Sequence, residues 1–384
     1  MIRFLWTKYD FRNNVILNEV MISEKGKDKF KPVNPNNLYI EARAAGHKTS
    51  IAEINIFLWS DYIKKINPLE AYFQKVSTQW NETEHGDYIE RFSAYVKVPD
   101  QERFTIQFKK WLVRCVACAL EDDYFNKQAL VFVQYAQHGG KSTLTRYLIP
   151  EELKEYKTEN ISVDKDSLIA LCQNFMIIQD ELSTLSRVEI NAQKTLMSKT
   201  NIKVRHPYDR RPKMDPRRAS ILGSTNKDEF LTDETGSVRW LCFNVLEIDY
   251  RYSNDIDINI VWSQAYHLYK TGFKYEMTAE EIKENERANS LYKTVTMETE
   301  LIHKYYAPAT QESHQDFLTA TEITEELIRH TDSKMKINPV EVGKALKMLG
   351  FNQGQRRGHG TQRFPVKGYY LYRNPPTTYY KGDK

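Results

Sequence analysis

The chain has 384 residues, of which 41% are hydrophobic and 28% charged, and its formal net charge is +4. This length allows two or three domains with substantial cores, and the composition is that of a soluble globular protein rather than a disordered one. It contains no membrane-length apolar run, no N-terminal signal-peptide core, and only four cysteines, too few for a disulfide framework. We therefore expect a cytoplasmic protein with no membrane partner.

Residues 1–68 are interpreted as an N-terminal accessory region. Short alternating apolar segments at its start predict hairpins. From residue 36 onwards the spacing is helical in two pieces on either side of Gly46, and this pattern ends at Pro68. We expect the region as a whole to be mainly helical.

Residues 69–125 are predicted to form a helical, collar-like region. Apolar residues recur with the 3.6-residue period of a helix over residues 104–120. Cys115 and Cys118 form a CxxC motif inside this helix, but no second CxxC or CxxH completes a zinc site. We expect both cysteines to be buried.

Residues 126–250 are predicted to form a phosphate-binding core. The stretch ALVFVQYAQHGGKSTLTRYL runs from an apolar strand through a glycine turn into a helical pattern. Glycines let backbone N–H groups surround phosphate oxygens, while the following lysine and hydroxyl reach the phosphates and a magnesium ion. The full motif has glycine where this chain has Tyr135, so the sequence leaves ATP turnover open. The residues expected to bind ATP are Gln137, His138, Gly139, Gly140, Lys141, Ser142 and Thr143.

A second apolar run, over residues 175–178, leads through Gln179 into two carboxylates, Asp180 and Glu181. Ligands of parallel sheets bind beyond the carboxyl ends of the strands, so these acids should lie beside the phosphate loop. Asp180 would share a Mg²⁺ ion with Ser142, and Glu181 would polarise the water that attacks the γ-phosphate. The alternative is an acidic turn that merely closes a strand.

A third strand, over residues 219–223, runs into Ser224, Thr225 and Asn226. An asparagine at the tip of a neighbouring strand can orient the attacking water or contact the γ-phosphate. Turns also favour asparagine, and a simple turn is the alternative here.

The most basic part of the chain lies between the second and third strands. Its cations are Lys194, Lys199, Lys203, Arg205, Arg210, Arg211, Lys213, Arg217 and Arg218. The segment IKVRHPYDRRPKM predicts a strand, a turn and a return strand, forming a hairpin that presents basic side chains to a nucleic-acid backbone. The side chains expected to make this contact are Lys203, Arg205, His206, Arg210 and Arg211. A solvated basic face is the alternative.

Residues 251–310 are predicted to be a helical linker, and residues 311–384 a winged-helix-like domain. Two segments with helical spacing are followed by QRRGHGTQRF and VKGYYLYR, a basic glycine turn and an aromatic strand. In a winged helix of this outline, Arg356, Arg357 and Arg363 would contact duplex DNA from the wing. A domain for protein contacts is the alternative.

Six segments, in this order, resemble the virulence-associated E family of phage and mobile-element proteins: KKWLVRCVACAL, GGKST, DEL, KVRHPYDRRP, RRASILGSTN and EFLTDETGSVRWLCFNV. The resemblance implies an ATPase akin to superfamily 3 helicases, within the AAA+ group. Lys141 and Ser142 match its Walker A pair, Asp180 and Glu181 its Walker B pair, and Asn226 the polar residue of motif C. Arg239 matches an arginine that reaches the nucleotide of a neighbouring subunit.

The resulting hypothesis is an α/β protein with a P-loop AAA+-like ATPase core, a helical N-terminal region and a C-terminal winged helix. It would be an ATP- and Mg²⁺-dependent replicative DNA helicase in the cytoplasm of a bacterial host. We expect a homo-oligomeric ring, a hexamer, with single-stranded DNA in its channel and duplex DNA at the wing. One alternative is a nucleotide-binding origin-recognition or helicase-loading protein with little ATP turnover, and another is a defence or packaging motor.

Overall fold

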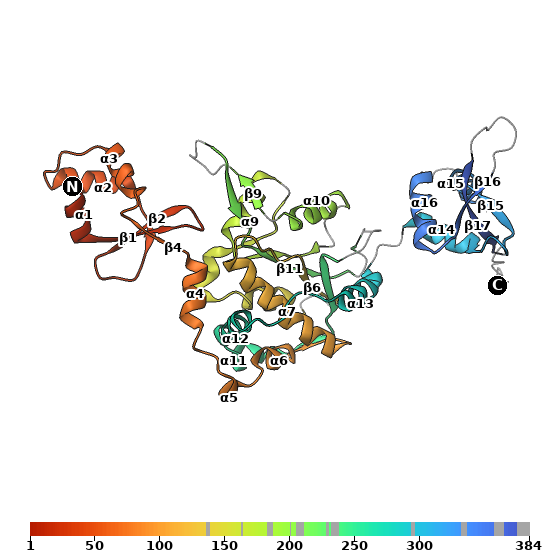
Figure 1. The fold of residues 1–384 in the computed structure, drawn as a ribbon, viewed down its shortest axis with the longest axis horizontal. Helices are drawn as coiled ribbons and strands as arrows, with labels where there is room; N and C mark the ends of the chain where they lie inside the picture. The colour runs from red at the N-terminus through yellow and green to blue at the C-terminus, as the bar shows by residue number, and fades with distance from the viewer. Residues whose placement is uncertain are drawn as a thin grey trace, which may run out of the picture. The chain divides into compact units, whose positions relative to one another are not determined.

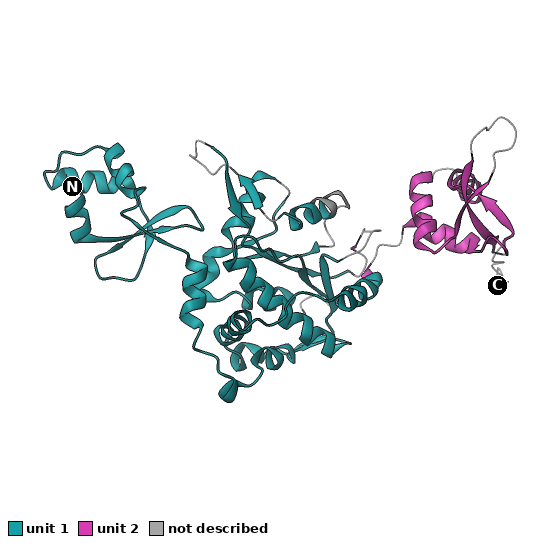
Figure 2. Ribbon diagram, in the orientation of Figure 1, with its two compact units in different colours: residues 1–228, 238–291 teal, residues 229–237, 292–384 magenta. Residues whose placement is uncertain are grey.

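The computed structural model of this chain describes residues 1–135, 139–162, 164–182, 187–199, 201–204, 211–227, 230–231, 238–292, 296–331, 336–356 and 365–374. The chain divides into two compact units (Figure 2). Unit 1 contains residues 1–228 and 238–291, and unit 2 contains residues 229–237 and 292–384. In the described part of the chain, no helix is both long enough and apolar enough to cross a membrane.

The first 66 residues form a module of three helices and a four-stranded sheet with the strand order β3-β2-β1-β4 (Figure 1). The hairpin of β1 and β2 and the helices α2 and α3 confirm the local predictions. The expectation of a helical region is incomplete, because the region also contains this sheet, in which Val20 and Ile22 of β2 are buried with the two-residue period of a strand. The elements are α1 Ile2–Lys8, β1 Tyr9–Asn14, β2 Glu19–Glu24, β3 Lys31–Pro32, α2 Pro35–Ala44, α3 Ile51–Leu58 and β4 Lys64–Ile66.

Four helices follow: α4 Pro68–Val76, α5 Glu82–His85, α6 Tyr88–Ser93 and α7 Gln101–Leu120. The long predicted helix is α7, which begins where the Asp100 side chain accepts a hydrogen bond from the Arg103 N–H at 3.0 Å. Cys115 and Cys118 are buried on α7, as predicted. Among the described residues, no cluster of three or more His, Cys, Asp or Glu side chains could hold a metal ion.

A five-stranded parallel sheet with the order β12-β6-β11-β8-β7 forms the centre of unit 1. The three predicted strands are β6, β11 and β8, and every residue in them is buried. Because β11 pairs with both β6 and β8, the carboxyl ends of all three lie side by side. The strands are β6 Ala129–Val133, β7 Lys157–Glu159, β8 Met176–Gln179, β11 Ser220–Thr225 and β12 Trp240–Asn244.

Helices pack against this sheet and against one another. The ring of Phe104 on α7 contacts Phe132 of β6 and Phe243 of β12, with centroids 6.3 and 5.0 Å apart. Trp262 of α12 is fully buried, and its indole N–H donates to the Leu148 carbonyl at 2.9 Å. The packing of α12 and α13 therefore attaches most of the predicted linker to unit 1. The remaining helices of unit 1 are the 3-10 helix Glu151–Tyr156, α8 Lys141–Tyr147, α9 Lys165–Gln173, α10 Arg187–Met197, α11 Tyr252–Asp255, α12 Ile258–Lys270 and α13 Ala279–Asn289.

Two antiparallel pairs of short strands complete unit 1. The strands β9 Asn201–Val204 and β10 Lys213–Pro216 form one pair, which confirms the predicted hairpin. The strands β5 Val96–Lys97 and β13 Glu247–Ile248 form the other. The second pair connects the helical region before the sheet to the segment that follows β12.

Unit 2 has a central strand, β17, that pairs antiparallel with β14, β15 and β16. Tyr369 and Leu371 of β17 are buried in one core with Ile323 and Leu346 of the helices. The predicted order of two helices followed by a β-ribbon is confirmed, whereas a winged-helix role in DNA binding stays a prediction. The elements are α14 Met297–Tyr305, β14 Tyr306–Pro308, β15 Asp316–Leu318, α15 Ala320–His330, α16 Pro339–Met348, β16 Gln353–Arg356 and β17 Val366–Arg373.

Candidate functional site

A cavity of about 520 Å³ lies where the chain leaves β6, β8 and β11. Among the residues that line it are eight predicted ones: Gly139, Gly140, Lys141, Ser142, Thr143, Asp180, Glu181 and Asn226. Gln137 and His138 lie outside the described residues. The sequence analysis did not select Ser224, Thr225 or Tyr250, which also line the cavity. The position of Ser224 and Thr225 at a strand end was a usable signal, whereas nothing in the sequence pointed to Tyr250.

Lys141 is the first residue of α8, and its side chain reaches back to the loop. Its ammonium Nζ donates to the Gln134 carbonyl at 2.8 Å. Partial burial lowers the pKa of Lys141, and the nearby negative charge of Asp180 opposes that effect. A cation held at this place can exchange its neutral carbonyl partner for an anionic ligand.

Asp180, which follows β8, is hydrogen-bonded to residues of α8, of β11 and of the turn after β7. The Ser142 hydroxyl donates to Asp180 Oδ2 at 2.8 Å, and the Ser224 hydroxyl donates to Asp180 Oδ1. The Asp180 N–H donates to the Asn160 side-chain oxygen at 2.9 Å. Carboxylate and hydroxyl oxygens suit Mg²⁺, which usually takes only one or two carboxylates together with substrate phosphates. Ser142 and Asp180 therefore fit the predicted magnesium ligands in their chemistry.

Two glycines before α8 lie close to neighbouring side chains. A Cβ on Gly139 would lie 1.9 Å from the Gln134 Oε1, and one on Gly140 would lie 2.5 Å from the Tyr250 hydroxyl. Gly140 also has a φ of 86°, which favours glycine. Glu181 has a φ of 55°, a conformation that costs a residue with a side chain roughly 1–2 kcal/mol. Such strain is concentrated at functional sites.

Arg239 lies elsewhere on the sheet. It directly precedes β12, and its Nε donates to the Ser198 hydroxyl at 2.9 Å. Because the five strands are parallel, residues that precede them are at the amino edge, whereas the cavity is at the carboxyl edge. The structure thus separates Arg239 from the residues of its own chain that line the cavity.

The basic hairpin is less uniformly exposed than the sequence suggested. Lys203 and Arg211 are exposed, while Arg205, His206 and Arg210 lie outside the described residues. Three other cations of this basic stretch, Lys194, Arg217 and Arg218, are buried, with at most 8% of each exposed. These three cations lie inside the folded core. The basic surface therefore has fewer cations than the sequence of this stretch contains.

Arg217 is fully buried, and backbone carbonyls receive its hydrogen bonds. Its Nη1, Nε and Nη2 donate to the carbonyls of Met197, Ala219 and Asn126 at 2.7, 3.1 and 3.4 Å. Burial lowers the pKa of Arg217. The guanidinium therefore joins α10, β11 and the segment before β6.

Of the three predicted wing residues, Arg356 is exposed on β16, where its guanidinium lies 5.4 Å from the centre of the Phe317 ring. Arg357 and Arg363 lie outside the described residues. The wing as a DNA contact therefore stays a prediction.

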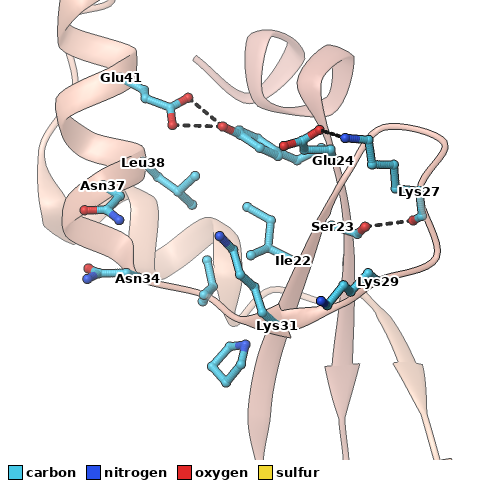
Figure 3. A pocket seen from close by; sticks show the side chains of 13 residues that line it. Ile22, Ser23, Glu24, Lys27, Lys29, Lys31, Asn34, Asn37, Leu38 and Glu41 are labelled. Carbon is cyan, nitrogen blue, oxygen red and sulfur yellow. Dashed lines mark hydrogen bonds and ion pairs between the residues drawn. The ribbon is translucent and has the colours of Figure 1, made fainter.

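A second cavity, of about 580 Å³, lies between α2 and the β2–β3 segment of the N-terminal module (Figure 3). Its two carboxylates already have partners: the Tyr9 hydroxyl donates to Glu41 at 2.8 Å, and Lys27 pairs with Glu24. Burial of the ring and this hydrogen bond raise the pKa of Tyr9 to about 12. The cavity at the sheet edge is the stronger candidate site, because eight residues selected from the sequence line it.

The chain was compared with family models, with curated proteins and with solved structures. It matches one family model and several solved structures. Residues 74–294 match the model of the virulence-associated protein E-like domain. The comparison with curated proteins gave no match.

Three of the structures matched are of the C-terminal region of NrS-1 without ligand, each covering 97% of this chain and 98% of that one. One structure, of residues 305–718, has a TM-score of 0.48 at 9% identity. Two structures described as the A form have TM-scores of 0.45 and 0.42 at 10% and 8% identity. These scores are too low to carry a conclusion about function.

Proposed function

This chain belongs to the virulence-associated protein E-like family, and from that membership and the geometry of the cavity we propose an ATP-dependent DNA helicase of a phage or mobile genetic element. One observation carries the proposal. Lys141, Ser142, Asp180, Glu181 and Asn226, which the sequence selects for their chemistry, line a single cavity although 85 residues separate the first from the last (226 − 141).

The chemistry proposed for these residues follows from their contacts. Lys141 binds the β- and γ-phosphates in place of the Gln134 carbonyl that it now contacts. Ser142 and Asp180 hold Mg²⁺, which would neutralise charge on those phosphates. Glu181 accepts a proton from the attacking water, and Asn226 orients that water by hydrogen bonding.

The proposed partners follow from the positions of the remaining cations. Lys203 and Arg211, exposed on the hairpin, contact the backbone of single-stranded DNA in the channel of a ring. Arg356 contributes to binding duplex DNA at the wing. Arg239 acts on the nucleotide of the neighbouring subunit, which requires a homo-oligomer, proposed to be a hexamer.

A nucleotide-binding loader with little ATP turnover is the second candidate, and Tyr135 favours it. This residue stands where the full phosphate-loop motif has glycine. Its side chain is 64% exposed, so most of the ring faces solvent.

The test is steady-state ATP hydrolysis measured with and without single-stranded DNA, beside particle shape by negative-stain electron microscopy. The helicase proposal expects ring-shaped particles and hydrolysis that DNA stimulates. Tight nucleotide binding without turnover, with or without DNA, would favour the loader instead. A protein that binds no nucleotide would overturn both.

A further inference from the structure

Unit 2 has a second sheet face, directed away from its helices. Side chains alternate along a strand, so Tyr369 and Leu371 of β17 enter the core while Gly368, Tyr370 and Tyr372 project to the other side. Tyr372 is 39% exposed, which confirms that this side is open to solvent.

The neighbouring strands add three residues to this side. Phe317 of β15 pairs with Tyr370, while Gly354 and Arg356 of β16 pair with Gly368 and Val366. Residues that pair across strands project to the same side of a sheet. We call the surface formed by Phe317, Gly354, Arg356, Gly368 and Tyr370 the aromatic face.

The two glycines leave room for the rings to lie against the sheet. A Cβ on Gly354 would be 2.5 Å from the Tyr370 hydroxyl, and one on Gly368 would be 2.6 Å from Phe317 Cε1. The two ring centres are 5.0 Å apart, and the Arg356 guanidinium is 5.4 Å from that of Phe317. Two aromatic rings and one cation therefore form a continuous surface.

The chemistry of this surface points to a particular class of ligand. The Arg356 guanidinium lies beside these rings, where its positive charge can pair with a phosphate of a nucleic-acid backbone. Partly exposed rings beside a cation are typical of sites on which unpaired bases stack. Duplex DNA hides the faces of its bases, so it cannot use such rings.

We propose that the aromatic face binds single-stranded nucleic acid, with bases stacked on Phe317 and Tyr370 and a phosphate contacted by Arg356. This site shares Arg356 with the predicted wing contact but adds two aromatic rings, on which only unpaired bases can stack. It requires no ATP turnover, so it stands or fails separately from the helicase proposal. The competing explanation is purely structural: the rings cover the two glycines and stabilise the sheet.

The test uses the full-length chain without nucleotide, and fluorescence anisotropy with two labelled oligonucleotides: a thymidine 10-mer and an abasic 10-mer with the same backbone. Phe317→Leu and Tyr370→Leu are each expected to bind the thymidine 10-mer about tenfold more weakly, as for loss of one stacked base, and the abasic 10-mer as before. Tyr370→Phe keeps a ring and should bind both as the unmodified protein does.

Tyr305→Leu is the matched control, because Tyr305 is another partly exposed tyrosine of unit 2, stacked on His330 away from the aromatic face. Repeating the series in a Lys203→Ala, Arg211→Ala background prevents the hairpin from hiding the effect. A uridine 10-mer distinguishes RNA from DNA as the preferred strand, and tight binding of either supports the proposal.

Two results would overturn the proposal: equal affinity of the unmodified protein for the thymidine and abasic 10-mers, or unchanged binding in both leucine variants. If a leucine variant does not fold, oligonucleotide binding by Arg356→Gln tests the proposal instead. Loss of the Arg356 charge should weaken the binding of both oligonucleotides and reduce the slope of log affinity against log salt by about one unit. An unchanged slope would contradict the phosphate contact.

Discussion

At the scale of single residues, the candidate site depends on one carboxylate. Asp180 accepts hydrogen bonds from Ser142 and Ser224, which follow or end two different strands. Hydrogen bonds to an ionised carboxylate are roughly twice as strong as neutral ones. Asp180 thus joins α8 to the ends of β8 and β11 before any ligand binds, and polar groups that are already in place need not reorganise during a reaction.

Lys141→Ala and Glu181→Gln should separate binding from hydrolysis. The first change removes the ammonium next to the phosphate loop, so ATP affinity should fall and turnover should decrease by about 100-fold or more. The second keeps the shape of the side chain but removes its basicity, so ATP should stay bound without being hydrolysed. Nucleotide affinity and kcat measure the two effects, with exposed Lys165→Ala as the control. Equal turnover in both variants and the unmodified protein would contradict the assignment.

Arg217→Leu should destabilise unit 1 although the side chain is far from any proposed chemistry. Three backbone carbonyls would lose their donor inside the core, and an unpaired buried polar group costs about 1–3 kcal/mol. Removal of a buried charge partly offsets this cost, so we expect the free energy of unfolding to fall by about 2–4 kcal/mol. Urea unfolding measures it, and exposed Arg211→Ala should change stability by about 0.5 kcal/mol or less. Equal stability of the two variants would refute the structural role of Arg217.

At the scale of elements, the alternation of side chains along β9 determines which side of the hairpin carries the charge of Lys203. Ile202 and Val204 of β9 are buried, so Lys203 between them projects to the opposite side of the strand. Its cross-strand partner is Met214, which is 60% exposed. The hairpin therefore has one face attached to the core and one directed to solvent, and Lys203 is on the second.

The double variant Lys203→Ala, Arg211→Ala should lose DNA stimulation of ATP hydrolysis but keep the basal rate. Both side chains are exposed and neither lines the cavity, so nucleotide binding should not change. Hydrolysis measured against single-stranded DNA concentration provides the test. Lys283→Ala, Arg287→Ala removes the same charge from the exposed side of α13 and serves as the control. Normal DNA stimulation in the hairpin variant would leave these residues as a solvated basic face.

At the scale of the whole molecule, Arg239 raises the question of assembly. A five-residue strand is about 16 Å long, so the amino edge of the sheet, where Arg239 begins β12, is far from the cavity at the other edge. An arginine cannot span that length. If Arg239 takes part in ATP hydrolysis, a second copy of the chain must bring it to the cavity.

Mixing two inactive variants tests this arrangement. Arg239→Ala and Lys141→Ala should each be inactive alone, but a mixed ring contains interfaces where one subunit supplies Lys141 and its neighbour Arg239. In an equal mixture about a quarter of the interfaces are complete, so activity should return to roughly that fraction. Ser198→Ala, which removes the partner of Arg239 in its own chain, should retain activity. An inactive mixture would exclude catalysis across subunits.

Much of the local structure and most of the candidate site were predictable from the chain alone. Unbroken apolar runs mark β6, β8 and β11, because a strand buried on both faces in a parallel sheet excludes polar side chains. The polar residues that follow such strands are brought to one edge by topology, which is why Lys141, Asp180 and Asn226 could be selected without coordinates. Tyr250 could not, because it enters the cavity from a segment beyond β13 that has no such pattern.

Other properties depended on packing between segments that are distant in the sequence. Arg217 and Lys203 carry the same charge in the same basic stretch, yet one is fully buried and the other exposed, because charge does not indicate which side of an element meets the core. The aromatic face likewise needs the register that places Phe317 beside Tyr370 and two glycines beneath their rings. Short-range patterns specify which strands and helices form, whereas burial and cross-strand neighbours are long-range relations that arise only when the chain is folded.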